Sequence, residues 1–158
     1  YNALCATQVG YNLEISNEQI QQGISQIELT KKRMDIRKLE NGAILINDAY
    51  NASCESMKAS IKFLENYTGT RKIAVLGDML ELGHISEEEH RHIVELCKAQ
   101  NIDAFFVGEN FAALQIPGMK VFPNVEALND YLQQHPFADS MILIKGSHSI
   151  HLDKAVVG

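Results

Sequence analysis

Short apolar runs alternate with longer amphipathic segments along most of this chain. Apolar residues dominate 43–47, 72–76, 103–107 and 141–145, with a shorter run at Val121 and Phe122. Runs of this length, bounded by polar residues or Gly, predict strands that are covered on both faces. The segments that lie between them and have the period of a helix are 54–67, 87–100 and 125–134. Strands alternating with helices predict an α/β fold with a Rossmann-like, mainly parallel sheet flanked by helices.

Two of the predicted helices carry a clear apolar stripe. Met57, Ile61 and Leu64 are spaced i, i+4 and i+7, so they share one helix face, which we expect to pack on the sheet. The inner face of the next helix is His90, Ile93, Val94 and Cys97. Ser86 and Glu89 have the spacing of a capping box, which is expected to open that helix.

The first part of the chain has a different pattern. Residues 1–10 are small and apolar, which predicts a helix closed by Gly10. Ser16 and Gln19 form a further capping box, and the short helix that it opens is expected to end near Gly23. These helices precede the α/β pattern.

A linker and a hairpin connect these helices to the α/β pattern. Residues 24–32 are expected to be the linker, and 33–39 alternate between charged and apolar residues. Asn41-Gly42 then favours a hairpin with a type I′ turn. An antiparallel ribbon is therefore expected to lead into the core.

The two ends of the sequence suggest a piece of a longer protein. The first residue is Tyr1 rather than Met, and residues 151–158 resemble the beginning of a helix.

Composition excludes several classes of protein. The chain has 158 residues and a net charge of −6 without a basic cluster, which argues against a nucleic-acid partner. No apolar run approaches the roughly 20 residues of a membrane span. Cys5, Cys54 and Cys97 form no C-x-x-C pair, so we expect reduced thiols of a cytoplasmic protein and no zinc site. Cys54, near a predicted helix start, is a candidate for a reactive thiolate.

Polar residues follow each of the main predicted strands. In chain order they are Asp48, Tyr50 and Asn51; Asp78 and Glu81; Glu109 and Asn110; and Lys145, Ser147 and His148. The carboxyl ends of parallel strands lie on one edge of a sheet, where ligands of α/β proteins bind. The sequence therefore predicts a ligand site at this edge.

Each candidate has a functional and a structural interpretation. Asp48 could accept from two ribose hydroxyls, or form an Asx turn or helix cap. Asn51 could bind an adenine edge or be a turn residue, and Tyr50 could simply be packed. Lys145 with Ser147 could bind a carboxylate or phosphate, or form a solvated loop.

The remaining candidates are less specific. Asp78 and Glu81 could hold an ammonium group or act on a proton, or be solvated acids. His90 is more typical of a satisfied buried imidazole than of a catalytic group. Neither a G-x-x-x-x-G-K-[ST] phosphate loop nor a G-x-G-x-x-G motif follows a strand, so this chain encodes no complete nucleotide cradle of those types.

Several motifs together resemble one family. They are Asp48-Ala49-Tyr50-Asn51-Ala52, Ser56-Met57-Lys58, Ala74-Val75-Leu76-Gly77-Asp78-Met79-Leu80-Glu81-Leu82-Gly83 and Lys145-Gly146-Ser147. They resemble the carboxyl-terminal domain of the Mur ligases, most of all the type that adds D-alanyl-D-alanine. The resemblance covers nearly the whole chain. Residues 1–30 are similar to the last helices of the family's central ATPase domain, and residues 31–158 are similar to most of its third, carboxyl-terminal domain.

The resemblance implies a reaction and its partners. The family forms a peptide bond in the cytoplasm during peptidoglycan synthesis. ATP phosphorylates the carboxylate of UDP-N-acetylmuramoyl-tripeptide, and the amine of D-alanyl-D-alanine attacks the acyl phosphate, with Mg²⁺ neutralising the phosphates. The phosphate loop and the UDP-sugar site belong to upstream domains, so this chain alone is expected to be inactive.

The resemblance also implies roles for individual residues. Asp48 matches the ribose-binding acid, with Asn51 and Tyr50 beside the nucleotide. Arg33 resembles an arginine that reaches the γ-phosphate. The residues that match loops meeting the incoming amino component are Lys145, Ser147 and Asn110. Asp78 and Glu81, which could hold an ammonium group, are expected to contact the same substrate. His148 stands where the family often has arginine, and this departure changes the expected contact with a carboxylate.

Two other interpretations remain open from the sequence. A sister Mur ligase or a folylpolyglutamate ligase would use another amino substrate at the same edge. A non-catalytic α/β module would use the strand-end residues to bind a regulatory ligand.

Overall fold

The computed structural model describes residues 2–26, 34–67 and 71–157 of the chain. The chain divides into two compact units, Tyr1–Thr30 and Lys31–Gly158, and each is described by itself. Within the described residues, no helix is both long enough and apolar enough to cross a membrane.

The first unit is a pair of helices, α1 (Asn2–Asn12) and α2 (Asn17–Ser25). The predicted capping box is confirmed, because Ser16 accepts from the Gln19 N–H and the Gln19 side chain accepts from the Ser16 N–H. The prediction that Gly10 closes the first helix is wrong. A Cβ at Gly10 would lie 2.8 Å from side-chain atoms of Ile20, so this glycine lets the two helices approach closely.

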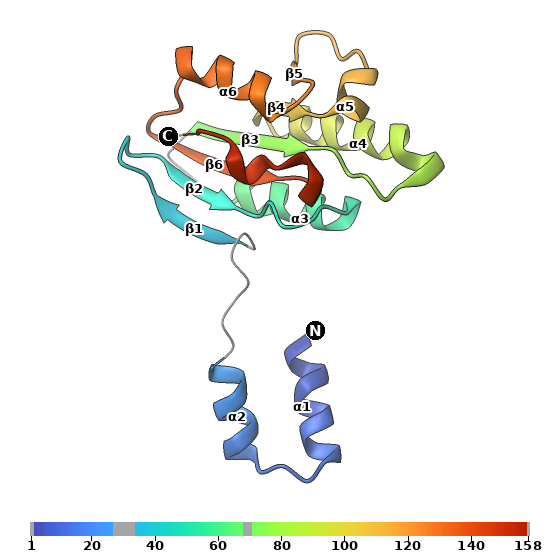
Figure 1. Cartoon of the computed structure of the whole chain (residues 1–158), viewed down its shortest axis with the longest axis vertical. Coiled ribbons are helices and arrows are strands. Elements are labelled where there is room, and N and C mark those ends of the chain that lie inside the picture. Colours follow the sequence, from blue (N-terminus) through green and yellow to red (C-terminus); the bar gives the residue numbers. More distant parts are fainter. Residues whose placement is uncertain (1, 27–33, 68–70, 158) are drawn as a thin grey trace. The chain divides into compact units, whose positions relative to one another are not determined.

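The second unit is the α/β domain (Figure 1). Its strands are β1 (Asp35–Lys38), β2 (Ile44–Asn47), β3 (Arg71–Gly77), β4 (Asp103–Val107), β5 (Lys120–Phe122) and β6 (Ser140–Lys145). Its α-helices are α3 (Cys54–Glu65), α4 (Ser86–Ala99), α5 (Glu109–Ala113) and α6 (Val125–Gln134). Short 3₁₀ turns are η1 (Gly83–Ile85), η2 (His148–Ile150) and η3 (Leu152–Lys154).

The described strands form one sheet in the order β1-β2-β6-β3-β4-β5. Only the β1–β2 pair is antiparallel, so the predicted mainly parallel sheet with an amino-terminal hairpin is confirmed. The last strand, β6, lies between β2 and β3, with Ile44 opposite Met141 and Ile73 opposite Ile142. This insertion brings the segment after β6 beside the segment after β2.

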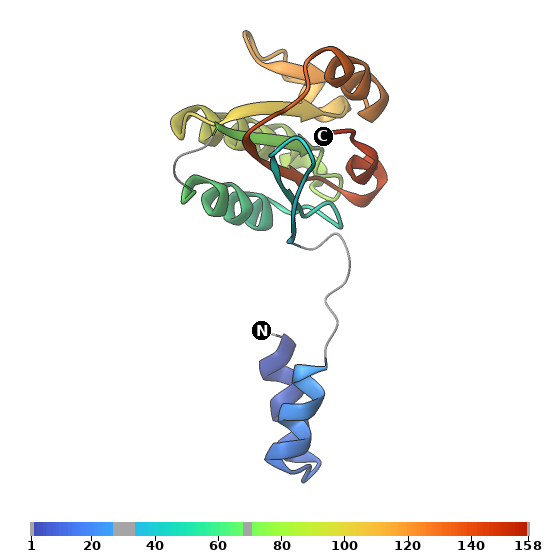
Figure 2. The same ribbon diagram turned by 90° about the vertical axis from the view of Figure 1, so that its left-hand side faces the viewer.

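The two faces of the sheet are covered by different helices (Figure 2). Met57, Ile61 and Leu64 of α3 are fully buried with the inner face of α4 in one core cluster, as their spacing predicts. The other cluster contains the apolar residues of α6, followed by Leu152 and Val157 after β6. The connections that leave β2 and β6 therefore cross to opposite faces, which makes a switch point between these neighbouring strands.

Three local predictions differ from the structure for tertiary reasons. In the hairpin only Gly42 has a positive φ, 85°, and its N–H bonds the Leu39 carbonyl at 3.2 Å, so the turn is not type I′. Helix α4 begins without a side-chain cap, because the η1 turn continues into it and Ser86 bonds elsewhere. The predictions missed α5, whose first N–H groups bond Asp78 from another strand end.

Candidate functional site

The polar residues that follow the parallel strands do meet at one edge of the sheet. Pairing of β2 with β6, of β6 with β3, and of β3 with β4 brings their carboxyl ends together. Two neighbouring pockets open there, of about 300 Å³ and 380 Å³, and both are lined by Tyr50 and Asn51. The edge predicted from the sequence therefore contains a real cavity.

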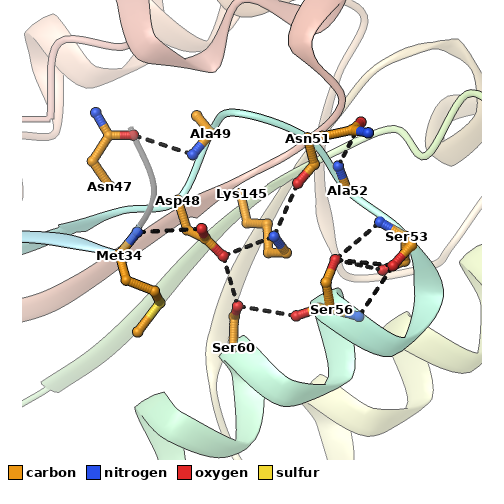
Figure 3. A network of polar contacts seen from close by, with 10 residues as sticks. All are labelled: Met34, Asn47, Asp48, Ala49, Asn51, Ala52, Ser53, Ser56, Ser60 and Lys145. Carbon is orange, nitrogen blue, oxygen red and sulfur yellow. Dashed lines mark hydrogen bonds and ion pairs between the residues drawn. The ribbon is translucent and has the colours of Figure 1, made fainter. Parts of the chain in front are cut away.

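An ion pair forms the floor of the first pocket (Figure 3). Lys145 ends β6 with its side chain only 3% exposed, and its Nζ lies 2.7 Å from Oδ2 of Asp48. The same ammonium donates to the Asn51 carbonyl at 3.0 Å. The Ser60 hydroxyl, on the inner side of α3, adds a 2.9 Å hydrogen bond to the same carboxylate oxygen. The ammonium and the hydroxyl together hold Asp48 at a fixed position.

Asp48 does not serve as a turn or cap residue. Among the described residues, only the Met34 N–H donates to its other oxygen, Oδ1, through a long hydrogen bond of 3.3 Å. The local Asx-type bonds of this loop are made instead by Asn47 to the Ala49 N–H and by Asn51 to the Ala52 N–H. A carboxylate with this arrangement keeps acceptor capacity on the oxygen that Lys145 does not engage.

The amino-terminal end of α3 forms a further wall of the first pocket. Ser53 caps the helix, and the Ser53 and Ser56 side chains each accept from the other residue's N–H. With Asp48, Tyr50 and Asn51, these hydroxyls line the pocket above Lys145. A carboxylate, an ammonium, hydroxyls and an exposed aromatic ring suit a polar ligand that carries hydroxyl groups and a planar ring.

The second pocket lies beside the first, past Tyr50 and Asn51. It is also lined by Leu80, Glu81, Ser147, His148 and Ser149. The Tyr50 ring lies 6.2 Å from the His148 ring, so the two rings border the same opening. Glu81 and His148 are exposed, so a carboxyl group and an imidazole are available to a polar ligand at this opening.

Asp78 and Asn110 direct their polar atoms inward. Oδ2 of Asp78 accepts from the backbone N–H and the side-chain amide of Asn110, at 2.8 Å and 3.0 Å. Its Oδ1 accepts from the Phe111 N–H at 3.0 Å, and the residue is 1% exposed. Both residues border a third hollow of about 300 Å³, but their hydrogen bonds favour a positioning role over the direct substrate contact expected from the sequence.

Ser147 is also engaged within the protein. Its Oγ accepts from the Leu80 N–H and its own N–H donates to the Asp78 carbonyl, both at 3.0 Å. Ser147 is therefore placed to hold the loop after β3 against the loop after β6, at the border of the second pocket.

His90 is a satisfied buried imidazole, as the commoner interpretation predicted. It is fully buried; its Nδ1 lies 2.6 Å from the Ser86 carbonyl and its Nε2 lies 3.0 Å from the Met79 nitrogen. His90 lines none of these three pockets, and its Nε2 contacts the loop after β3 at Met79.

The reactive-thiolate hypothesis for Cys54 is wrong. Burial raises the pKa of the Cys54 thiol, and a hydrogen bond from the thiol to Glu89 and the charge of Glu89 raise it further. The position at the start of α3 does not offset these effects, so Cys54 stays protonated near neutral pH.

The structure does not describe every residue that the sequence predicted for the site, and it adds one that the sequence did not predict. Arg33 falls outside the described residues. In the part of the chain that the structure describes, no three acidic, His or Cys side chains converge as metal ligands. Ser60 was missed, although it had a signal, because it is a small polar residue on the buried face of α3.

An open parallel sheet with polar pockets beyond its carboxyl edge, at a switch point, defines an α/β ligand-binding domain. The amino-acid sequence shows which family of α/β domains the chain belongs to. Residues 32–148 match the family model described as Mur ligase, glutamate ligase domain, and the chain belongs to this family.

Individual relatives agree with this assignment. The UDP-N-acetylmuramoyl-tripeptide--D-alanyl-D-alanine ligase of Bacillus subtilis is 31% identical over 98% of this chain and 36% of that protein. The ligase of the same name from Buchnera aphidicola (strain Bp) is 35% identical over 98% and 35%.

Solved structures give the same result. The UDP-N-acetylmuramoylalanyl-D-glutamyl-2,6-diaminopimelate--D-alanyl-D-alanyl ligase of Acinetobacter baumannii has a TM-score of 0.76 and is 30% identical, covering 98% of this chain and 34% of that one. The chain thus spans about a third of the length of the relatives that it matches.

Proposed function

We propose that this chain is the carboxyl-terminal domain of an ATP-dependent ligase. The ligase joins D-alanyl-D-alanine to UDP-N-acetylmuramoyl-tripeptide through an acyl phosphate, a cytoplasmic step of peptidoglycan synthesis. The observation that carries the proposal is the pocket built on Asp48 and Lys145 at the switch point of the sheet. The names of the relatives, matched over nearly the whole chain, support the choice of substrates.

The first pocket is the proposed nucleotide site. The carboxylate of Asp48 accepts from the ribose hydroxyls through the oxygen that Lys145 does not engage. Asn51 and Tyr50 lie at the exposed rim and contact the base, the first through its amide and the second through its ring. Lys145 fixes Asp48 and adds positive charge near the phosphates.

The second pocket is the proposed site of the incoming dipeptide. Glu81 faces the ammonium of D-alanyl-D-alanine, and Ser147 places the loop that carries Glu81. Because both pockets are lined by Tyr50 and Asn51, ligands bound in them are neighbours, as attack of an amine on an acyl phosphate requires.

The rest of the machinery is proposed to lie at the amino-terminal end of the α/β domain and in the domains that precede it. Residues 1–30 are the end of the preceding ATPase domain, and Arg33 follows them and reaches the γ-phosphate. Upstream domains provide the phosphate loop, the UDP-sugar site and the ligands of Mg²⁺, whose charge neutralises the phosphates. The 158-residue chain alone is then inactive, because the positioning groups are divided between domains.

The test is ligation by the full-length enzyme that contains this chain. Purified enzyme is given ATP, Mg²⁺ and UDP-N-acetylmuramoyl-tripeptide with D-alanyl-D-alanine. Parallel reactions contain diaminopimelate, D-glutamate or L-alanine, each with the shorter UDP-N-acetylmuramoyl acceptor that still lacks that residue. Formation of product only in the reaction that contains D-alanyl-D-alanine supports the proposal. Product with another amino component identifies a sister ligase, and binding of nucleotide without any ligation identifies a non-catalytic module.

A further inference from the structure

A closed ring of hydrogen bonds lies behind the second pocket. The Asp78 carboxylate accepts from the Asn110 amide, whose Oδ1 accepts from the Ser86 hydroxyl at 3.3 Å. The Ser86 carbonyl accepts from His90, and His90 in turn accepts from the N–H of Met79, the residue next to Asp78. The ring thereby ties the loop after β3 to the starts of α4 and α5.

The hydrogen-bond partners fix the protonation of His90. A carbonyl oxygen can only accept, so the 2.6 Å contact with Ser86 places the proton on Nδ1. Nε2 is then an acceptor, and its lone pair receives the Met79 N–H. The 3.7 Å separation between Nε2 and Oδ1 of Asp78 is therefore not an ion pair, because Nε2 carries no hydrogen.

Backbone groups of three consecutive residues are held by three different elements. The N–H of Asp78 donates to the Val107 carbonyl of β4, and its carbonyl accepts from the Ser147 N–H. The Met79 N–H bonds His90 of α4, and the Leu80 N–H bonds the Ser147 hydroxyl. These hydrogen bonds anchor the backbone at this point of the loop, although the next residues are exposed.

The exposed residues of the loop are the ones that line the pockets. Leu80 is 46% exposed and lines both the second and the third hollow, and Glu81 lines the second. Neither lines the pocket above Lys145. The ring therefore controls the wall of the proposed dipeptide pocket and leaves the proposed nucleotide pocket untouched.

We propose that Asp78 and His90 are positioning residues that hold Leu80 and Glu81 at the second pocket, and that they touch no substrate. The carboxylate of Asp78 anchors the loop to α5, and the neutral imidazole of His90 anchors it to α4. The kinetic part of this inference rests on the proposed function, whereas the structural part does not.

The structural part is tested by amide hydrogen exchange in the 158-residue chain. His90→Ala removes the acceptor, and the exchange of Met79 and Leu80 is expected to rise about tenfold. His90→Gln can present an oxygen where Nε2 lies and is expected to restore most of the protection. His92→Ala, on the exposed face of the same helix, is the matched control and leaves exchange unchanged.

The kinetic part uses the full-length enzyme. Asp78→Asn keeps the size of the side chain but loses one hydrogen-bond acceptor and the negative charge. This conservative variant is used so that the test does not depend on a larger change that prevents folding. Asp78→Asn and His90→Ala are each expected to raise KM for D-alanyl-D-alanine about tenfold, with kcat and KM for ATP within about twofold. Asp103→Asn, at the opposite edge of the sheet, leaves these constants unchanged.

Three results would overturn the inference. The first is unchanged exchange at Met79 and Leu80 in His90→Ala. The second is increased exchange with an unchanged KM for the dipeptide, and the third is an equal rise in both KM values. If the wild-type enzyme does not use D-alanyl-D-alanine, the proposed function fails. The positioning role is then decided by amide exchange at Leu80 in His90→Ala, without the kinetic test.

Discussion

The ammonium of Lys145 lies 2.7 Å from the carboxylate of Asp48, although the two residues are 97 positions apart in the chain. Lys145 is the more deeply buried partner, with 3% of its side chain exposed against 14% for Asp48. The pair therefore joins the ends of β2 and β6 at the floor of the first pocket. Both the stability and the proposed nucleotide contact of this domain depend on it.

Because Lys145 is more deeply buried than Asp48, removing one partner is expected to change the free energy of unfolding more than removing the other. Asp48→Ala leaves a buried ammonium unpaired and is expected to lower the free energy of unfolding by about 3 kcal/mol. Lys145→Met is expected to cost about 1 kcal/mol, because Asp48 keeps its bonds to Ser60 and Met34. The measurement is urea unfolding of both single variants and the double variant, whose loss should be smaller than the sum. Additive losses would contradict the coupling.

The proposed ribose contact predicts a selective kinetic effect. In the full-length enzyme, Asp48→Asn is expected to raise KM for ATP about tenfold and to change KM for D-alanyl-D-alanine by less than about threefold. The reason is that the carboxylate lines the first pocket and not the second. Steady-state kinetics with each substrate varied in turn are the measurement. An unchanged KM for ATP would remove Asp48 from the nucleotide site.

Gly108 is expected to be intolerant of any side chain. Its φ is +127°, and a Cβ there would lie 2.3 Å from Cγ of Asp78. Gly108→Ala should therefore lower the free energy of unfolding by more than about 2 kcal/mol, through strain and displacement of the carboxylate. The matched control is Gly118→Ala, which has φ +74° and no neighbour within 4 Å, and should cost only about 1 kcal/mol. Equal losses in thermal or urea unfolding would contradict the steric explanation.

Burial of the Cys97 thiol predicts that the free energy of unfolding falls at alkaline pH. Burial raises the pKa of its thiol from 9.0 to about 12. Above pH 9 the unfolded chain loses this proton while the folded chain keeps it, so the thiol's contribution is complete below that pH and is lost as the pH rises toward 12. Denaturant unfolding between pH 8 and 11 should show Cys97→Ala falling less steeply than the wild type. Parallel curves would exclude a role for this thiol.

Elements with local signals were predictable from the sequence. Strand β4 was predicted over the residues that it occupies, and so was α6, where Asn124 caps the helix through the Ala127 N–H. Helix α5 was missed because five residues are too few to show a period, and its cap is a carboxylate from a distant strand end. The capping box at Ser86 failed for a related reason, since the Ser86 hydroxyl contacts Asn110 of α5.

Some features of the candidate site were likewise predictable from the sequence, and others were not. That Asp48, Asn51 and Lys145 share one edge follows from the direction of parallel strands, and the structure confirms it. That Asp78 and Asn110 bond each other could not be predicted, because a polar residue after a strand has the same sequence signal whether it faces a ligand or its neighbours. Only packing decides between these alternatives.

The sequence by itself determined the order of strands and helices, the buried stripe of α3 and the presence of polar residues after each strand, because these depend on local period and turn chemistry. The tertiary structure decided that β6 lies between β2 and β3. Strands buried on both faces are uniformly apolar, so their pattern does not specify which strand pairs with which. That choice, made by the packing of α3, α4 and α6 on the two faces, brings Lys145 to Asp48 and creates the site.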